Sequence, residues 1–395
     1  MPAPDDRSDQ PPRYVTHANW MRPDLMHRSF QHVEQVAPTT TVDRGPGPVS
    51  DLPTELADLS GFTFVDHTGE TRTLDSYLER EHVDALIVWR NGKVRQEVYR
   101  NGQTRRSRHI VFSVTKSFTG LLAEMLIEEG VLDDRRLVSD LVPELGRPGG
   151  AFADATVRHV LDMEVGIDFT EIYDDPQSDI RQFSYASGFR ATPPDVTAHR
   201  SLYDYLPTLR KRGEHGVDFH YVTANSEVLG WVIEAVTGTP IAQLLEDRIY
   251  SHVGTERDAF YLTDPLGKAV AGGGMCITAP DLLRLALLVA NDGVWNGQRL
   301  VSESVIARLK AGGTPRPSLW GNEGGGSDFS YRSQWYTHHP GRVLYASGIH
   351  GQSIYLSTEH DSAMVLHSSN PDADGEFFAV GAAYFAAITR YLDDV

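Results

Sequence analysis

The stretch from Ala85 to Gly130 constrains the fold of this chain more than any other, because it combines a strand pair with a buried helix. The run ALIVWRNGKVRQEVYR places Asn91-Gly92 between two β-rich segments, which is the strongest short-range signal for a β-hairpin. The run SFTGLLAEMLIEEGVLD follows, with apolar residues at helical spacing and Gly130 placed to end the helix. We therefore predict a sheet edge followed directly by a buried helix.

The middle of the chain is predicted to be mostly helical. Three segments are amphipathic at helical spacing: VRHVLDM, SLYDYLPTLRKRG and SEVLGWVIEAVTGTPIAQLLEDRIYSHV. A further helix follows within AGGGMCITAPDLLRLALLVANDGVW, then strands in RVLYAS, QSIYLS and AMVLHSS, and a last helix in EFFAVGAAYFAAITRYL.

These patterns divide the chain into an arm and two lobes. Residues 1–55, rich in Pro, Thr and Asp, are predicted to form an extended N-terminal arm without chemistry. Residues 56–134 and 261–395 are predicted to form an α/β lobe, and residues 135–260 a helical lobe. We expect a single catalytic unit with its site between the lobes.

The net negative charge of the chain excludes some classes of binding partner. A formal net charge of −18 opposes binding to nucleic acid and to anionic membranes, because both depend on Lys and Arg neutralising phosphate. No run of about eighteen uncharged apolar residues is present, and the N-terminus lacks a basic start followed by an apolar run. We therefore expect a cytoplasmic protein that acts on a small molecule.

Ser113-Val-Thr-Lys116 is the strongest catalytic candidate. The serine opens the predicted helix, and the lysine lies three residues on, so both side chains share one face. A buried lysine with a lowered pKa can take the proton of a serine hydroxyl, and the free N–H groups of the first helical turn can stabilise an oxyanion. The alternative is a capping serine and a surface lysine.

The sequence resembles a known family at several places in order. FSVTKSFTG, VRHVLDMEVGI, FHYVTANSEVLGWVIEAVTG and AGGGMCITAPDLLRLALLVANDG resemble the β-lactamase-related serine hydrolases, which include penicillin-binding proteins and family VIII carboxylesterases. DFTEIYDDP, SGFR, YVTAN, RSQWY and SGIHGQ resemble the nylon-oligomer (6-aminohexanoate-dimer) hydrolases within that family. The resemblance implies a β-lactamase/transpeptidase-like α/β fold, with an antiparallel sheet flanked by helices and a mostly helical lobe.

The resemblance also implies catalytic roles. Ser113 would be the acyl-forming nucleophile, with Lys116 and Tyr221 as its proton partners, and either of the two could be the formal base. The backbone N–H groups of Ser113 and Ile349 would form the oxyanion hole. Gly348 would let the backbone approach the substrate closely and so bind it. From the residues alone, the tyrosine could instead pack in the core, and SGIHGQ could be an ordinary turn at a strand.

A second group of positions would bind substrate. Tyr173 matches a tyrosine on a loop that closes over the scissile amide, and the alternative is an ordinary surface tyrosine on a loop. Arg190 matches an arginine that meets the substrate carboxylate. Asn225 could instead cap the helix that begins near it. The remaining matched positions are Ser184, Phe189, Thr223, Gly272, Tyr336 and His350.

Several of these positions depart from the family pattern. The Lys-Thr-Gly of many relatives is replaced by Ala346-Ser347-Gly348, and the missing lysine argues against a true β-lactamase. Ser184 stands where the nylon-oligomer hydrolases place an acid for the substrate amine, and Gly272 replaces an amide-bearing side chain. Both changes weaken the case for recognition of a linear amino-acid dimer.

Other chemistries lack their motifs. The sequence has no HExxH and no Cys/His cluster, so we predict no metal site. It has no Gly-x-Gly-x-x-Gly and no Gly-x-Ser-x-Gly, which argues against a dinucleotide site and against an α/β-hydrolase. We predict no cofactor.

The sequence therefore predicts a serine hydrolase of small linear amides and short-chain esters. The alternatives are a carboxylesterase with little amidase activity, a D-amino-acid peptidase or weak β-lactamase, and a non-hydrolytic acyl-binding or penicillin-sensing scaffold. The resemblance implies a homodimer, with no nucleic acid or membrane partner.

Overall fold

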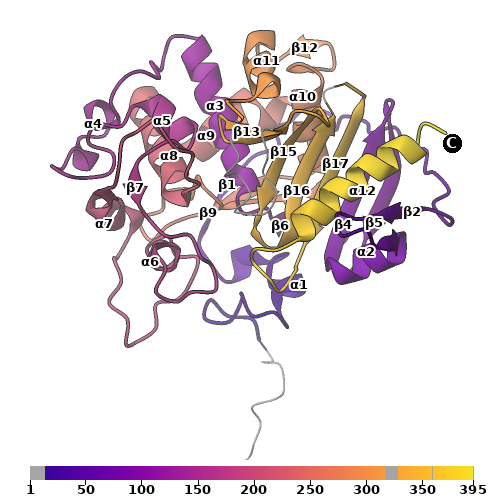
Figure 1. Ribbon diagram of the computed structural model, residues 1–395, viewed down its shortest axis with the longest axis horizontal. Helices are drawn as coiled ribbons and strands as arrows, with labels where there is room; N and C mark the ends of the chain where they lie inside the picture. Colours follow the sequence, from indigo (N-terminus) through magenta and orange to yellow (C-terminus); the bar gives the residue numbers. More distant parts are fainter. Residues whose placement is uncertain (1–13, 316–327, 358, 395) are drawn as a thin grey trace, which may run out of the picture.

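The computed structural model of the protein describes residues 14–315, 328–357 and 359–394, and its centre is a seven-stranded antiparallel sheet (Figure 1). The strands, in spatial order, are β13 (Phe329–Arg332), β14 (Trp335–His338), β15 (Val343–Gly348), β16 (Gln352–Ser357), β17 (Ser362–Ser368), β4 (Val83–Arg90) and β5 (Lys93–Tyr99). The predicted hairpin joins β4 to β5. Asn91 and Gly92 have φ of 50° and 79°, the positive values that a tight hairpin turn needs. As predicted, this hairpin forms one edge of the sheet.

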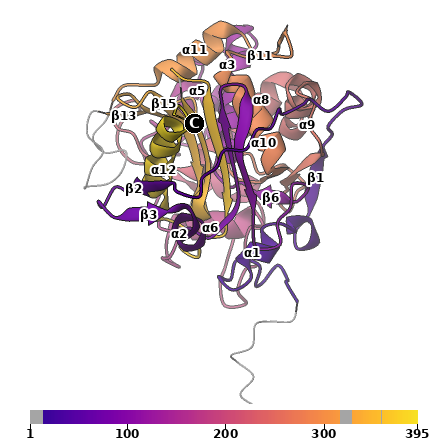
Figure 2. The same ribbon diagram turned by 90° about the vertical axis from the view of Figure 1, so that its right-hand side faces the viewer.

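Helices cover both faces of this sheet, which explains why β4 contains a continuous apolar run at residues 85–89. All eight β4 residues are buried, and residues 85–89 alternate between two cores. Ile87 packs in the larger core with helices α3 (Val114–Glu128) and α10 (Ala279–Ala290), whereas Leu86 packs with α2 (Leu74–Arg80) and α12 (Phe377–Tyr391). Figure 2 shows the sheet between these two layers.

A second, four-stranded sheet positions the start of α3. Its strands, in spatial order, are β1 (Thr39–Val42), β9 (Ala259–Leu262), β10 (Met275–Thr278) and β6 (Arg108–Ile110). Because Ile110 at the end of β6 pairs with Cys276 of β10, the chain enters α3 from a fixed direction. Gly130, with φ of 71°, follows the last turn of α3 as the sequence predicted.

The described part of the N-terminal segment packs on the body of the molecule. It contains α1 (Met26–Ser29), the 3-10 turn η1 (Val33–Gln35) and β1, while residues 1–13 of the predicted arm lie outside the described residues. Trp20 is buried, and its indole N–H donates to the carbonyl of Phe189 at 2.7 Å. The segment therefore reaches the region of the molecule that holds residues 180–190.

The middle of the chain gathers on the side of the molecule away from α12 (Figure 1). Its helices are α4 (Val138–Leu141), α5 (Val157–Leu161), α6 (Asp179–Ala186), α7 (Leu202–Tyr205), α8 (Thr223–Thr237) and α9 (Ile241–Arg248), with 3-10 turns η2 (Pro143–Leu145), η3 (Leu206–Thr208) and η4 (Tyr250–His252).

One helix prediction in this region is wrong. The amphipathic run SLYDYLPTLRKRG forms only the single turn of α7 and the 3-10 turn η3, because Pro207 has no N–H to continue the α-helical hydrogen bonds. The chain then forms β8 (Arg210–Lys211), which pairs with β7 (Ile167–Asp168).

Five of the remaining elements lie at the periphery: β2 (Thr63–Val65), β3 (Thr71–Thr73), β11 (Val294–Trp295), β12 (Gln298–Arg299) and α11 (Glu303–Ala311). The 3-10 turn η6 (Ile349–Gly351) instead joins β15 to β16 in the interior and contains the buried His350. No single helix among the described residues has the length and apolar character needed to cross a bilayer.

Candidate active site

Ser113 lies where the chain turns from β6 into α3. Phe112, immediately before it, has φ of 40°, an unusual backbone conformation for a residue with a side chain. Ser113 occupies the N-cap position, but its side chain accepts no capping hydrogen bond. The hydroxyl is therefore available to the pocket, and the capping alternative is wrong.

Lys116 lies one turn into α3 and is almost fully buried, with 1% of its surface exposed, so the surface-lysine alternative is also wrong. Its Nζ donates to Ser113 Oγ at 2.8 Å and to the carbonyl oxygen of Gly272 at 2.5 Å. Burial lowers the pKa of this lysine to about 8, against the smaller opposing effect of Glu171 and Glu227. Lys116 therefore remains mostly charged at pH 7 but loses its proton far more readily than an exposed lysine.

Tyr221 brings a second proton-carrying group to Ser113. Its hydroxyl lies near enough to the Ser113 side chain for that side chain to influence its pKa, and Lys116 Nζ lies 5.3 Å from the centre of its ring. Burial, with the neighbouring Tyr336 and Glu171, raises the pKa of Tyr221 well above its usual range. The phenol therefore stays protonated while Lys116 loses its proton more readily.

A buried carboxyl group holds the loop that contacts Lys116. Glu227 on α8 accepts the backbone N–H of Gly272 at 2.6 Å and that of Ala271 at 3.1 Å. Burial raises the pKa of Glu227 to about 8. Glu227 thus holds the backbone of Gly272 in place, and the carbonyl oxygen of Gly272 accepts the hydrogen bond from Lys116 Nζ.

Ile349 and Gly348 bring the end of β15 against the start of α3. A Cβ added to Gly348 would lie 2.6 Å from the Val111 carbonyl oxygen and 3.0 Å from Ser113 N, so only glycine allows this approach. Among the backbone hydrogen bonds outside helices and strands in the described residues, neither the Ser113 nor the Ile349 N–H is a donor. Both N–H groups are thus available for a substrate oxygen.

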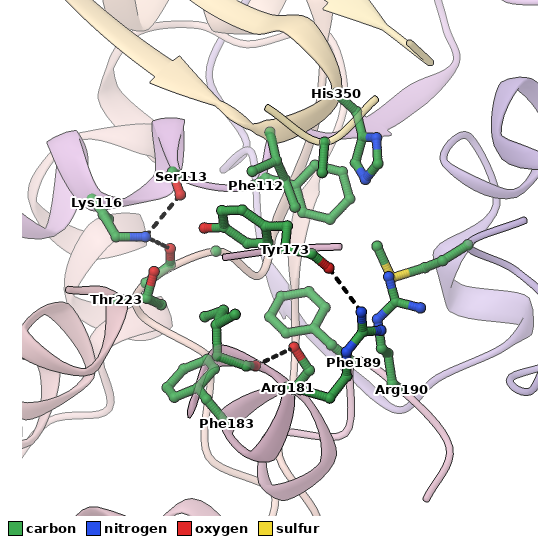
Figure 3. A pocket seen from close by; sticks show the side chains of 17 residues that line it. Phe112, Ser113, Lys116, Tyr173, Arg181, Phe183, Phe189, Arg190, Thr223 and His350 are labelled. Carbon is green, nitrogen blue, oxygen red and sulfur yellow. Dashed lines mark hydrogen bonds between the residues drawn. The ribbon is translucent and has the colours of Figure 1, made fainter. Parts of the chain in front are cut away.

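A pocket lies in front of Ser113 (Figure 3). Ten of the predicted site residues line it: Ser113, Lys116, Tyr173, Ser184, Phe189, Arg190, Thr223, Gly272, Ile349 and His350. The His350 ring donates from Nδ1 to the Asn370 carbonyl at 2.8 Å, which leaves Nε2 as an acceptor with no partner among the described residues. Burial lowers the pKa of His350 to about 4, so the ring is neutral.

The loop that carries Tyr173 is tied to the start of α8. The Tyr173 hydroxyl donates to Glu171, and the same carboxylate accepts the backbone N–H of Thr223 at 2.7 Å and its hydroxyl at 2.6 Å. The Arg181 guanidinium donates to the Tyr173 carbonyl at 2.7 Å. Tyr173 is thus a half-buried pocket residue rather than a free surface tyrosine.

Three predicted substrate-binding residues, Asn225, Tyr336 and Gly348, are not among the residues that line the pocket. Asn225 is fully buried in α8, and its amide nitrogen contacts Met163 Sδ at 3.4 Å. It does not cap the helix either, because the N-cap residue is Val222. Tyr336 lies behind Tyr221 and stacks on Tyr345 with ring centres 5.0 Å apart. In this structure Asn225 and Tyr336 make packing contacts, and their contacts with substrate remain predictions.

Sequence reasoning missed seven residues that line the pocket: Met21, Phe112, Ile180, Arg181, Phe183, Gly273 and Ala373. Arg181 lies three residues before the predicted Ser184 on one helix, so helical spacing could have found it. Met21 comes from the segment to which no chemistry was assigned, and no sequence signal marks it. Among the described residues, no group of three or more His, Cys, Asp or Glu side chains is placed to hold a metal ion.

The chain is similar to known proteins over nearly its whole length. A sequence model of the Beta-lactamase family matches residues 72–387. The 6-aminohexanoate-dimer hydrolase of Paenarthrobacter ureafaciens is 32% identical over 382 residues, which are 95% of this chain and 94% of that protein. A solved structure from Bacillus anthracis named for 6-aminohexanoate-dimer hydrolase has a TM-score of 0.89 at 26% identity, over 98% of this chain and 99% of that chain. EstCE1, a hydrolase with promiscuous acyltransferase activity, shares the fold alone, with a TM-score of 0.62 at 16% identity over 79% and 96% of the two chains.

Proposed function

The chain belongs to the Beta-lactamase family of hydrolases, as its motifs predicted, and from that premise we propose that it forms an acyl-enzyme on Ser113. Its proposed substrates are small linear amides of the 6-aminohexanoate-oligomer type and short-chain esters. The observation that carries the proposal is the contact of one hydroxyl with two proton carriers, since Ser113 meets both Lys116 and Tyr221. A scaffold that only binds acyl groups needs neither of these contacts.

The opposite pKa shifts of the two partners favour a division of labour. Lys116, with its pKa lowered to about 8, takes the proton as Ser113 Oγ attacks the carbonyl carbon. Tyr221 remains a phenol and relays a proton to the departing nitrogen or oxygen. The C–N or C–O bond breaks, the leaving group departs protonated, and the acyl group stays on Ser113.

Water completes the reaction. It attacks the acyl-enzyme carbonyl and gives its proton to the same Lys116/Tyr221 pair, and the acid leaves as Ser113 recovers its hydrogen. In both steps the carbonyl oxygen gains negative charge, which the N–H groups of Ser113 and Ile349 would stabilise. Removing one such donor in other hydrolases costs about 10²- to 10³-fold in rate.

A second candidate function is a carboxylesterase with little amidase activity. Ser184 and Gly272 line the pocket where the resemblance placed an acid and an amide, so a linear amino-acid dimer meets fewer polar partners here. An ester also needs less help, because an alkoxide leaves more readily than an amine. The homodimer and the cytoplasmic location remain predictions.

The test is steady-state hydrolysis of p-nitrophenyl acetate and of the linear 6-aminohexanoate dimer by wild type, Ser113→Ala and the exposed-site control Ser60→Ala. We expect Ser113→Ala to lose at least about 10³-fold of ester turnover and Ser60→Ala to match wild type. A fluorophosphonate probe should label Ser113 alone, as read by peptide mass spectrometry. Ester cleavage without amide cleavage would select the carboxylesterase, and full activity of Ser113→Ala would refute the nucleophile.

A further inference from the structure

The hairpin turn between β13 and β14 lies inside the molecule. Its two central residues, Ser333 and Gln334, are buried, whereas connecting turns usually lie on the surface. Their φ values are 52° and 67°, which a tight two-residue turn requires and which asparagine and glycine adopt with less strain. A strained conformation persists only where the surroundings impose it, so the side chains of this turn are candidates for a specific role.

The backbone of this turn contacts the helix that carries Lys116. The carbonyl of Gln334 accepts a hydrogen bond from the Ser117 hydroxyl at 2.8 Å. One turn after Lys116, a Cβ added to Gly120 would lie only 2.1 Å from the carbonyl oxygen of Ser333. The glycine therefore lets the turn pack directly against α3, beside the residues that follow the lysine.

The side-chain amide of Gln334 reaches two further helices. Its Oε1 accepts the hydroxyl of Ser226 on α8 at 2.6 Å. Its Nε2 donates to the carbonyls of Leu161 at 2.8 Å and of Val160 at 3.3 Å, at the end of α5. Because a carbonyl oxygen can only accept, the amide nitrogen must face α5 and the amide oxygen must face α8. The buried side chain is thus held in one orientation between the two helices.

The contacts on α3 and α8 lie beside two ionisable groups of the candidate active site. Ser117 follows Lys116 in the sequence, and Ser226 precedes Glu227. Within the described residues no hydrogen bond runs directly from α3 to α8, and the two helices are joined by Gln334 and by the backbone around Gly272 instead.

The contact on α5 leads to Tyr221. Met163 follows the end of α5, and its carbonyl accepts the backbone N–H of His220 at 2.8 Å. The Met163 sulfur also contacts the backbone N–H of Val222 at 3.5 Å. His220 and Val222 are the neighbours of Tyr221 in the sequence, so the end of α5 supports the backbone that carries the phenol.

We infer that Gln334 is a positioning residue for the hydrolysis proposed above: it holds α3, α8 and the end of α5 together and thereby sets how Lys116 and Tyr221 meet Ser113. The inference rests on the proposed function and adds a residue that does not line the pocket. Apolar packing between helices is non-directional, whereas the hydrogen bonds of one buried amide fix the helices relative to one another. A displacement of about 1 Å at reacting groups can lower a rate about 100-fold.

Gln334→Met tests the inference, because methionine keeps the length of the side chain and removes the amide. We expect kcat for p-nitrophenyl acetate to fall about 10- to 100-fold with little change in KM. Looser packing of α3 against α8 would admit water around Lys116, whose pKa is lowered mainly by burial, so the pKa of this lysine should rise. The midpoint of the pH–rate profile should then move to higher pH. Glu171 and Glu227, the charged groups that act on Lys116, are unchanged in this variant.

The pKa of Lys116 is also read without turnover, by NMR of protein whose lysines carry carbon-13 at Cε, with Lys116→Met to assign the signal. Two further variants separate positioning from general stability. Gln96→Met removes another buried amide, whose partner is the hydroxyl of Tyr384 on α12 at 2.6 Å. This control should lower the melting temperature but keep the wild-type kcat and the wild-type pKa of Lys116.

Ser226→Ala removes only the contact of Gln334 with α8. It should change kcat and the pKa of Lys116 in the same directions as Gln334→Met, by smaller amounts. The double variant should match Gln334→Met, because the two side chains act through one contact. If Gln334→Met does not fold, the criteria below apply to Ser226→Ala.

The outcomes distinguish the inference from the proposed function. If wild type cleaves the ester through Ser113, a Gln334→Met protein that keeps either the wild-type kcat or the wild-type pKa of Lys116 overturns the inference alone. If nothing is cleaved through Ser113, but the pKa of Lys116 rises in Gln334→Met and not in Gln96→Met, the proposed function fails and the placing of Lys116 by Gln334 stands. An unshifted pKa in such an inactive protein would overturn both.

Discussion

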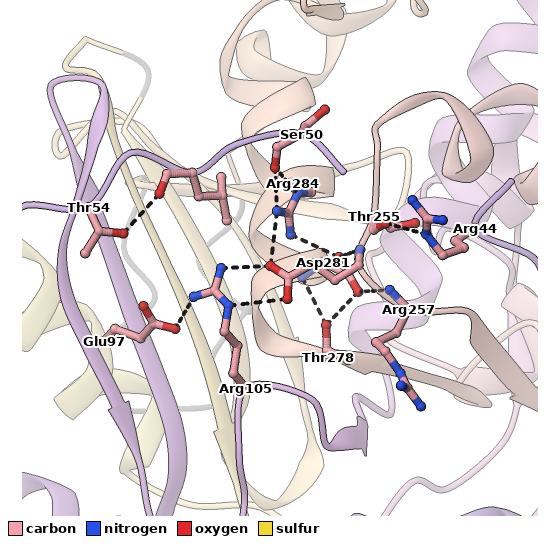
Figure 4. Close-up of polar contacts among 12 residues, drawn as sticks. Arg44, Ser50, Thr54, Glu97, Arg105, Thr255, Arg257, Thr278, Asp281 and Arg284 are labelled. Atoms are coloured by element: carbon pink, nitrogen blue, oxygen red, sulfur yellow. Dashed lines mark hydrogen bonds and ion pairs between the residues drawn. The ribbon is translucent and has the colours of Figure 1, made fainter. Parts of the chain in front are cut away.

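Two buried clusters of charged groups in this molecule are built in opposite ways. In the first, shown in Figure 4, the fully buried Arg284 on α10 contacts Asp281 at 3.1 Å, Glu256 at 3.2 Å and the Ser50 carbonyl at 2.6 Å. Glu256 also accepts from Arg105 at 2.8 Å. Every charge in this cluster has a counter-charge within contact, so the cluster binds the N-terminal segment, α10 and the β5–β6 connection into one body.

The cluster around Lys116 lacks such pairing. Two of its ionisable groups, Lys116 and Glu227, do not touch, because the backbone of Gly272 lies between them. Burial therefore lowers the pKa of the lysine and raises that of the carboxyl group, both to about 8. In this molecule, buried charges in direct contact stabilise the fold. Buried charges separated by a peptide group have shifted pKa values and can exchange protons near neutral pH.

The substitution Lys116→Met is expected to have the largest effect, and it tests whether this lysine serves catalysis rather than stability. If Lys116 is kept for proton transfer, kcat/KM for p-nitrophenyl acetate should fall by about 10³-fold or more. The melting temperature should rise, because the variant no longer buries an ammonium group that lacks a carboxylate contact. Steady-state kinetics and calorimetry on the same sample check both halves. A large drop in stability would show that Lys116 belongs with the structural charges.

Arg284→Met tests the opposite cluster. Removing this cation leaves Asp281 and Glu256 without one of their partners in a buried site, which should destabilise the fold by about 3 kcal/mol. The kcat of the folded fraction should stay near that of wild type. Urea unfolding and kinetics at low temperature measure the two effects. A loss of kcat without a loss of stability would contradict the structural role.

Gly348→Ala tests how far catalysis depends on the positions of the Ser113 and Ile349 backbone N–H groups. The added methyl would lie 2.6 Å from the Val111 carbonyl oxygen and must push β15 away from Ser113. A displacement of about 1 Å in the oxyanion region should lower kcat about 10- to 100-fold with little change in KM. Gly61→Ala, which meets open space, is the matched control and should be neutral. Wild-type kcat in Gly348→Ala would argue against an oxyanion site at this strand end.

Glu227→Gln tests, through the pH dependence of kcat/KM, whether Glu227 influences the pKa of Lys116. In wild type, kcat/KM should rise as pH rises through about 8, where Lys116 becomes a free base. The negative charge of Glu227 raises the pKa of Lys116, so its removal should move this midpoint to lower pH. We expect a rate loss of less than about 10-fold at high pH, and the exposed-site variant Glu303→Gln should keep the wild-type profile. A pH–rate series records the midpoint, and an unshifted one would mean that the two groups are not electrostatically linked.

The parts of the structure that the sequence predicted are those encoded over short distances. The hairpin at Asn91-Gly92 follows from the turn residues themselves, and the contact between Ser113 and Lys116 follows from their spacing on one helix. The family and fold expected from the ordered motifs are confirmed.

The parts that it did not predict depend on distant segments or on backbone groups. Met21 reaches the pocket from a segment more than ninety residues before Ser113, and nothing in its local pattern shows that. Gly272 was matched by position to a side chain, but its role here lies in its carbonyl and N–H, which no residue letter reveals. At Pro207 the error is of the opposite kind: the periodic pattern predicted a longer helix, and a single proline ended it.

The N-terminal segment has a consequence for how this protein can diversify. Met21 lines the pocket, and Trp20 and His17 fasten the segment to the carbonyls of Phe189 and Gly188, each at 2.7 Å. All of these N-terminal residues precede the region, 72–387, that defines the family, whereas the groups proposed to carry the chemistry lie inside it. Mutation of the leading segment can therefore change which molecules are admitted while the inherited reaction centre keeps its sequence.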